Sequence, residues 1–346
     1  MTETDQIIEA FDARARRREE RRGFFTNVMG MAAVATAGAA AMSLASEAQA
    51  QAAGPSEVDV LNFALNLEYL EAQFYSYAST GQGLPNNLLT GGVGTQGAVV
   101  TGTGAGSARQ VQFTDPAIAA YAREITADEI AHVAFLRAAI RGTGTSDALI
   151  AAQPAINISG AAGGAFAAAA ASTMPALTGF DPYLDDNSFL QAAFIFEDVG
   201  VTAYKGAAGA LINNKVYLEA AAGILAVEAY HAAIVRTALY ARGINTPTLP
   251  NNAGFANNIP AANAISNLRD SVDGSDDRDQ GLSATTVSNQ LVSNIVPLDS
   301  NGLAYSRSPA QVLNIVYLNP RSVTAGGFFP NGINNGNTAI RSSGAN

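Results

Sequence analysis

The chain contains two histidines, and each follows a glutamate by three residues. The pairs are Glu129 with His132 and Glu228 with His231. Positions i and i+3 of an α-helix lie on the same face, so each pair can place a carboxylate and an imidazole beside a metal ion. One Glu-x-x-His pair is weak evidence of a metal site. Two pairs on separate predicted helices are strong evidence.

Apolar residues at helical spacing predict a bundle of four helices whose inner faces carry these pairs. The expected helices span about residues 57–78, 115–141, 187–211 and 215–242. The second and fourth helices contain the two pairs within apolar stripes that step by three and four residues. The stripes of the first and third helices contain Glu68 and Glu197. Each inner face therefore has a glutamate at or near its middle.

The predicted helix ends follow ordinary capping signals. Asp115 with Pro116 is typical of a helix start, and Gly142 and Gly243 are expected to end the second and fourth helices. The third and fourth helices are separated by little more than two asparagines, so they should be antiparallel neighbours.

Four buried carboxylates that converge would repel one another unless something compensates their charge. Two divalent cations would cancel four carboxylates, and carboxylate oxygens with one imidazole per metal suit iron or manganese better than zinc. The alternative is that the glutamates lie on solvated faces and the histidines are hydrogen-bonded core residues. Because all six residues share the apolar stripes, we favour the metal site.

This pattern resembles the ferritin-like superfamily, whose two-metal members use a glutamate from each of two helices and a Glu-x-x-His pair from each of the other two. The resemblance implies the ligands Glu68, Glu129, His132, Glu197, Glu228 and His231. Tyr75 follows Glu68 by seven residues, as in the first helix of many such proteins. Glu71 lies one turn from Glu68. It is either the alternative ligand from this helix or a residue that contacts the ligands without binding the metal itself.

More narrowly, the chain is similar to the ferritin-like branch that includes plant desiccation-related proteins and bacterial and fungal stress proteins. The motifs that carry this resemblance are residues 65–72, residues 197–204, and residues 308–317 with 326–332. The resemblance covers nearly all of the chain after the leader. This branch has no well-defined reaction, so the resemblance implies the fold more strongly than the function.

The first 50 residues read as an export signal of the twin-arginine type. Six arginines precede an apolar run at about residues 28–45, and Ala48-Gln49-Ala50 has the form of a cleavage site. Arg21-Arg22-Gly23-Phe24-Phe25 looks like the twin-arginine motif. We expect cleavage after Ala50 and a periplasmic or secreted protein; a retained membrane anchor is the alternative. This route carries folded proteins, which suggests that a metal is loaded before export.

Composition and the positions of helix-breaking residues predict how the remainder of the chain is organised. The 346 residues are 48% hydrophobic, with a net charge of -10 and no cysteine, which argues against nucleic-acid binding and excludes disulfides. We expect a signal peptide (1–50), an all-α ferritin-like four-helix bundle with long irregular loops (51–243), and an irregular C-terminal extension packed on it (244–346). A short helix is expected at 165–171. The extension is expected to hold two ordered pieces, at 283–295 and from Ser308 onward.

Three functions are compatible with these observations. The first is a redox enzyme whose iron or manganese pair reacts with oxygen or peroxide as its small-molecule partner. The second is a non-catalytic desiccation or stress protein in which metal only stabilises the fold, and the third is iron storage. Tyr69, Tyr75, Tyr204 and Tyr230 lie on or beside the ligand helices, where electron transfer and core packing explain them equally. Association with the cell envelope and a homo-oligomeric state stay open.

Overall fold

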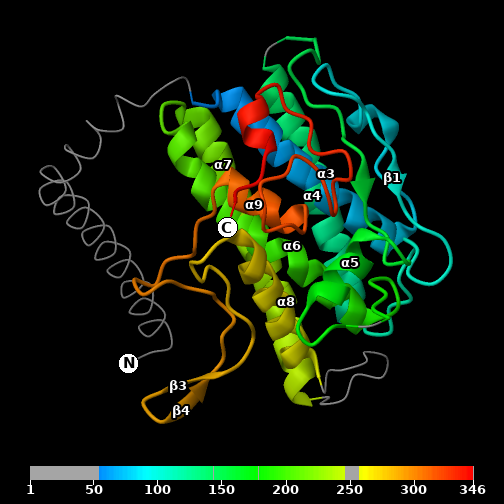
Figure 1. Ribbon diagram of the computed structural model, residues 1–346, viewed down its shortest axis with the longest axis vertical. Helices are drawn as coiled ribbons and strands as arrows, with labels where there is room; N and C mark the ends of the chain where they lie inside the picture. The colour runs from blue at the N-terminus through cyan, green and yellow to red at the C-terminus, as the bar shows by residue number, and fades with distance from the viewer. Residues whose placement is uncertain (1–53, 143, 178, 246–256, 346) are drawn as a thin grey trace, which may run out of the picture. The chain divides into compact units, whose positions relative to one another are not determined.

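Four long helices form the bundle that the sequence predicts (Figure 1). The computed structural model describes residues 54–345, except residues 143, 178 and 246–256. The bundle helices are α3 (Glu57–Thr80), α4 (Pro116–Arg141), α6 (Asp186–Ala207) and α7 (Lys215–Asn245). Helix α3 packs mainly on α4 and α6 mainly on α7. The predicted all-α architecture is confirmed. The predicted signal peptide lies outside the described residues.

Helices α3 and α4 start with side-chain caps, and the cap of α4 is the predicted one. The Ser56 side chain accepts a hydrogen bond from the Asp59 N–H, while the Asp59 side chain accepts one from the Ser56 N–H. Asp115 caps α4 through the Ala117 N–H and is followed by proline. The 3₁₀ helix η2 (Ala208–Leu211) follows α6 directly and completes the third predicted segment.

The prediction that Gly243 ends the fourth helix is wrong, because α7 continues to Asn245. Gly243 is buried, and a Cβ atom there would lie 2.6 Å from Ile259 Cγ1. This glycine therefore allows a neighbouring helix to approach closely and is not a C-cap.

The two long connections run along each other outside the bundle. β1 (Val99–Val100) in the first pairs in parallel with β2 (Ile156–Asn157) in the second. The first connection also holds η1 (Asn86–Leu88), and the second holds the predicted short helix, α5 (Ala165–Ser172). Phe166 of α5 packs edge-on against Phe328 of the C-terminal extension, with ring centroids 5.1 Å apart.

The C-terminal extension contains a helix that is not predicted from the sequence. α8 (Asn258–Asp273) packs against α6 and α7. Its segment is rich in asparagine and has a proline near its start, and both features favour a loop; a proline is tolerated in a first helical turn. The two predicted ordered pieces contain the hairpin β3 (Thr285–Val287) and β4 (Gln290–Val292), and α9 (Pro309–Val316). The last element is η3 (Thr338–Arg341).

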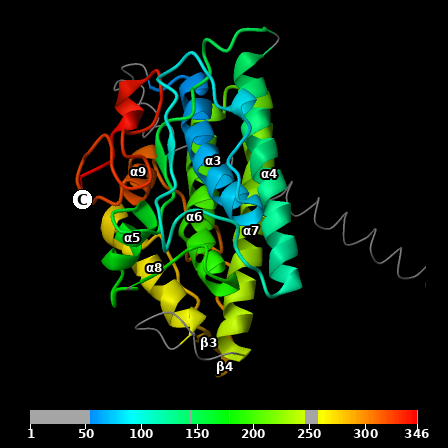
Figure 2. The same cartoon turned by 90° about the vertical axis from the view of Figure 1, so that its right-hand side faces the viewer.

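A buried ionic cluster joins this extension to the bundle. Its guanidinium groups and carboxylates are almost completely buried and alternate in ion pairs of 2.9 Å or less. The members are Arg236, Arg269, Arg307, Asp198, Asp273 and Asp279. Three positive and three negative side chains balance, which a buried cluster requires. Figure 2 shows α9 and α5 on one side of the bundle and α4 on the other.

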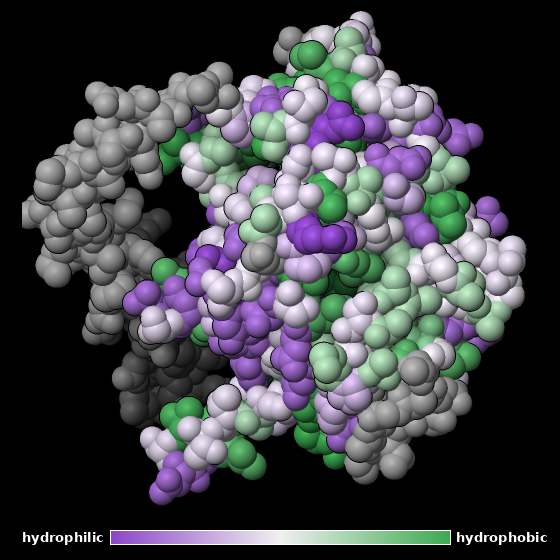
Figure 3. All heavy atoms as spheres, viewed as in Figure 1, coloured by the Kyte–Doolittle hydropathy of each residue, from purple (hydrophilic) through white to green (hydrophobic). Residues whose placement is uncertain are grey.

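Exposed apolar side chains are spread over several elements. On the face seen in Figure 3, hydrophilic and hydrophobic residues are interspersed. Of the described helices, α7 alone is long and apolar enough to cross a membrane, but Glu228 and His231 on it are buried in the bundle. We therefore describe α7 as a bundle helix.

Candidate metal centre

The structure brings all the predicted site residues together in the middle of the bundle. Each of the four long helices contributes at least one acidic side chain, and all of them are buried. The residues are Glu68 and Glu71 of α3, Glu129 and His132 of α4, Glu197 of α6, and Glu228 and His231 of α7. None of these side chains belongs to a loop, so rigid elements position the whole cluster.

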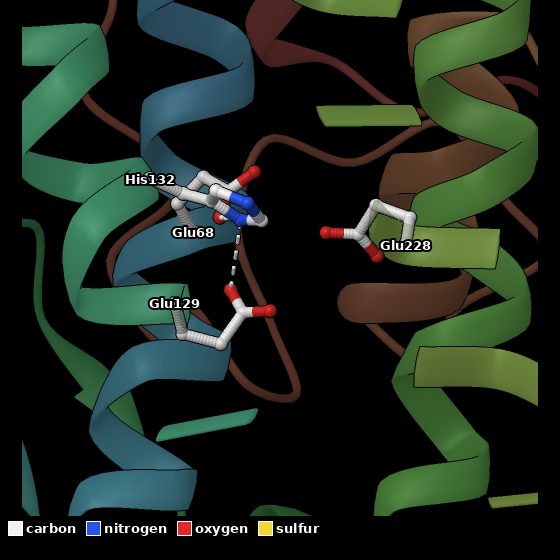
Figure 4. A group of neighbouring side chains, drawn as sticks. All are labelled: Glu68, Glu129, His132 and Glu228. Atoms are coloured by element: carbon white, nitrogen blue, oxygen red, sulfur yellow. Dashed lines mark hydrogen bonds and ion pairs between the residues drawn. The ribbon is translucent and has the colours of Figure 1, made fainter. Parts of the chain in front are cut away.

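Four of these residues form the first group around one point. Glu68, Glu129, His132 and Glu228 each offer a ligand atom, and these atoms lie within 4.8 Å of one another. His132 Nδ1 is 3.2 Å from Glu68 Oε2 and 3.8 Å from Glu129 Oε2. Figure 4 shows that the Glu228 carboxylate points across the bundle towards the other three side chains. This set of atoms can hold one cation.

A second group lies beside the first. Glu71, Glu197 and Glu228 have carboxylate oxygens within 4.8 Å of one another. His231 Nδ1 is 3.7 Å from Glu197 Oε2 and 3.1 Å from Glu129 Oε1. Glu129 thus has one oxygen towards each histidine, and Glu228 belongs to both groups. Two carboxylates are therefore placed to bridge two cations.

The buried polar atoms show that the cluster fits metal. Within the described residues, both carboxylate oxygens of Glu129 and Glu228, one each of Glu71 and Glu197, and Nδ1 of His231 make no hydrogen bond of good geometry, and Glu129 contacts the two histidines only as ion pairs. Buried acceptors without donors are costly, and native proteins contain few of them. Coordinated cations would satisfy these atoms, and a set rich in carboxylate oxygens with two imidazoles suits iron or manganese.

A glycine on α6 provides the room for one bridging carboxylate. A Cβ atom built on Gly200 would lie 2.1 Å from Glu228 Oε2, far inside contact distance. Any larger residue would therefore require the Glu228 carboxylate to shift from this position. Gly200 stands in the predicted inner stripe of the third helix, but that stripe gives no sign of a role beyond packing.

The electrostatics of the cluster favour retained protons in the absence of metal. Burial and the charge of Glu129 raise the pKa of Glu68 to about 7. Burial, opposed by His231, raises the pKa of Glu197 to about 8. Burial also raises the pKa of Glu71 and of Glu228 well above the usual range, reinforced by neighbouring carboxylates.

In contrast to the other glutamates, Glu129 and the two histidines favour their charged forms. Burial would raise the pKa of Glu129, but its close contacts with both histidines lower it to about 2. Burial would lower the pKa of His132, but Glu129 and Glu68 raise it to about 10. The pKa of His231 rises to about 9 in the same way, through Glu197 and Glu129. Protonated imidazoles thus take the place of cations around Glu129.

Two tyrosines link α3 and α6, the two bundle helices without histidines, through hydrogen bonds. Tyr75 of α3 donates a hydrogen bond to Glu197 of α6, and Tyr204 of α6 donates one to Glu68 of α3. In both helices the tyrosine follows its glutamate by seven residues, so the sequence contains a repeated spacing that could have revealed this exchange. Tyr69 instead donates to the Leu88 carbonyl, and the Tyr230 side chain is exposed. Core packing therefore does not explain Tyr230.

Asp128 is a contributor that sequence reasoning missed. Its carboxylate lies 3.1 Å from His231 Nε2, on the side of the ring opposite the cluster. An acceptor at Nε2 fixes the ring orientation and leaves Nδ1 free for a cation. The only sequence signal was that Asp128 directly precedes Glu129.

Comparisons with known proteins agree with this geometry. A family model described as ferritin-like domain matches residues 56–241, more than half of the chain. A ferritin-like catalase, Nec2 of Nesocodon mauritianus, is 27% identical over 293 residues, which cover 83% of this chain and 86% of the relative. The desiccation-related protein PCC13-62 of Craterostigma plantagineum is 30% identical over 275 residues, which cover 75% of this chain and 76% of the relative. No solved structure matches the chain.

Proposed function

The chain belongs to the ferritin-like domain family, and we propose that it is an exported two-metal protein, with iron or manganese, that decomposes hydrogen peroxide. The observation that supports this most strongly is the buried cluster of five glutamates and two histidines, in which seven carboxylate and imidazole atoms lack hydrogen-bond partners. A relative that covers most of the chain is named a ferritin-like catalase.

In this proposal, His132 and Glu68 would hold one ion and His231, Glu197 and Glu71 would hold the other, and Glu129 and Glu228 would be available to both. When bound, the metal pair would supply the reversible two-electron chemistry that peroxide decomposition needs. Tyr75 and Tyr204 hold Glu197 and Glu68 by hydrogen bonds. Asp128 orients His231. Burial excludes bulk water, which strengthens each electrostatic contact inside the bundle.

Peroxide is favoured over oxygen by the electron balance. Two molecules of hydrogen peroxide give two of water and one of oxygen, so peroxide is both the oxidant and the reductant. Oxygen reduction would require an external electron donor. The helix carboxylates can also change how they bind as the metal charge changes, since most of their oxygens are otherwise unengaged.

The direct test compares the wild-type chain with Glu197→Ala. Metal-loaded wild type should release one oxygen for every two peroxides, measured with an oxygen electrode. The variant should fold, because alanine suits a helix, and should be slower by roughly tenfold or more. A wild type with full iron or manganese that leaves peroxide unchanged would reject the catalytic proposal.

The second function is a structural stress protein whose metal only stabilises the fold. The desiccation-related relative supports it, since that protein matches about three quarters of the chain. In that case chelation should lower the melting temperature, while oxidant should leave the metal spectrum unchanged.

Export through the twin-arginine route is part of the proposal and rests on residues 1–50. Changing both Arg21 and Arg22 to Lys should block export, because that pathway reads the arginine pair and not its charge alone. Mass spectrometry of the exported wild type should find an N-terminus near Gln51. Intact Met1 in that fraction would favour a retained leader.

A further inference from the structure

An open groove between α4 and α7 reaches the outer side of the cluster. Its volume is about 710 Å³, which is the size of a pocket for an organic molecule and far more than hydrogen peroxide needs. The walls are mainly apolar and aromatic. They include Ile118, Tyr121, Val227, Tyr230 and Ile234, with Asp128 and His231 among the polar lining residues.

The orientation of His231 decides what a molecule in this groove can do. Nδ1 of the ring faces Glu129 and Glu197 inside the bundle, whereas Nε2 faces Asp128, whose side chain is 43% exposed. A molecule in the groove therefore meets the back of the imidazole and not the atoms that would bind metal. It can exchange an electron through the ring, but it cannot coordinate the cluster.

The charges of the groove restrict the kind of donor. Asp115 and Arg242 at one end form an ion pair of 3.0 Å. Glu124 and Asp128 add two further acidic side chains, which disfavour an anionic ligand. Tyr121 and Tyr230 offer aromatic rings, and the Asp128 carboxylate offers an acceptor for a hydroxyl group. A neutral phenol meets all three conditions.

We propose that this groove binds a neutral phenol as a one-electron donor to the centre, an inference that rests on the peroxide chemistry proposed above. Two phenols would each give one electron through the His231 ring and one proton to water at the open mouth of the groove. One hydrogen peroxide would take up two electrons and two protons to become two waters. The products of the donor are two phenoxyl radicals, which couple to a biphenol.

Binding of p-cresol to the mature chain tests the groove without requiring turnover. Titration calorimetry should show one site per chain in the wild type. Val227→Trp, which fills the groove, should raise the dissociation constant by about tenfold or more while the metal content stays unchanged. Tyr230→Ala provides a second variant: the side chain is 71% exposed, so its loss should leave folding intact and should also weaken binding. Ala222→Trp, on the exposed face of α7 outside the groove, should bind p-cresol like the wild type.

Two outcomes would overturn the proposal. One is the absence of p-cresol binding, or equal binding by wild type and Val227→Trp. The other is a dimer that Val227→Trp converts to a monomer in sedimentation, since the groove would then belong to a second copy. With peroxide present, biphenol fluorescence should appear in wild type and Ala222→Trp and fall in Val227→Trp. If p-cresol binds but peroxide is not consumed, the proposed function fails and only the binding site remains.

Discussion

Glu228 depends for its position on a residue that has no side chain. Gly200→Ala places a Cβ atom 2.1 Å from Glu228 Oε2, so the carboxylate must shift from its position in the two groups. We expect metal content, measured by atomic emission, to fall well below the wild-type value. Gly223→Ala is the matched control, because a Cβ there meets nothing within 4 Å. It should keep its metal and gain about 0.5–1 kcal/mol from helix propensity. Equal metal in both variants would contradict this role for Gly200.

In the metal-free protein, the protons that the cluster retains should make the free energy of unfolding fall as pH rises. Bound metal should reverse this dependence. Glu68 and Glu197 have folded pKa values of about 7 and about 8, above the usual glutamate value of 4.5, so the metal-free protein loses stability as pH rises from about 4.5 to about 8. His132 and His231, with pKa values of about 10 and about 9, extend the loss to higher pH. Below pH 4.5 the lowered pKa of Glu129 has the opposite effect, since its contribution is lost towards pH 2.

Metal binding must displace these protons, so a rise in pH favours the metal-bound form. The melting temperature of the loaded protein minus that of the chelated protein should therefore increase from about pH 6 to about pH 8. Calorimetric scans of both forms across this range measure the difference. A difference that shrinks with pH would mean that the cluster keeps its protons when metal binds.

At the scale of elements, α8 and α9 are joined to the bundle by the buried ionic cluster. Asp279 accepts from both Arg269 and Arg307, so Asp279→Asn leaves two buried guanidinium groups without that charge. We expect a loss of roughly 3 kcal/mol or more in the free energy of unfolding, measured by denaturant titration. Asp276→Asn is the control, because this side chain is 74% exposed, and it should cost little. Similar losses in both variants would show that burial does not decide the effect.

The elements that the sequence predicted are those with a strong periodic pattern. The four bundle helices and the stripes that carry their glutamates follow from spacing alone, because one face of each helix is buried in the core. Helix α8 was missed because its apolar stripe is diluted by asparagine, serine and aspartate. Gly243 was misread because a cap and a close helix contact both call for glycine, and only the position of Ile259 distinguishes them.

The candidate site shows the same limit: spacing within a helix can be read from the sequence, whereas contacts between helices cannot. Glu129, His132, Glu228 and His231 are predicted from their repeated spacing, whereas Asp128 contacts a histidine on another helix and has no spacing rule of its own. The choice between Glu68 and Glu71 also could not be made from sequence. In the structure they lie in different groups of possible ligand atoms, and which of the two binds metal stays a prediction.

At the scale of the whole molecule, the chain contains no cysteine, so disulfides do not stabilise it. Long connections and a C-terminal extension pack on the bundle that contains the glutamate and histidine cluster. The extension brings Phe328 against Phe196, with ring centroids 4.9 Å apart, on the α6 helix that carries Glu197. A pre-folded bundle that already holds metal would suit a leader of the twin-arginine type. The account thus depends on one central claim, that the buried cluster is a two-metal centre.

The number of metal ions per chain tests this claim most directly. Plasma emission spectrometry on the exported chain, quantified by amino-acid analysis, should give about two iron or manganese ions per chain. His132→Ala and His231→Ala should each lower that number and the melting temperature together, because carboxylates would be left buried and under-compensated. An exported wild type without bound metal, or either variant with the full number and unchanged stability, would contradict the account.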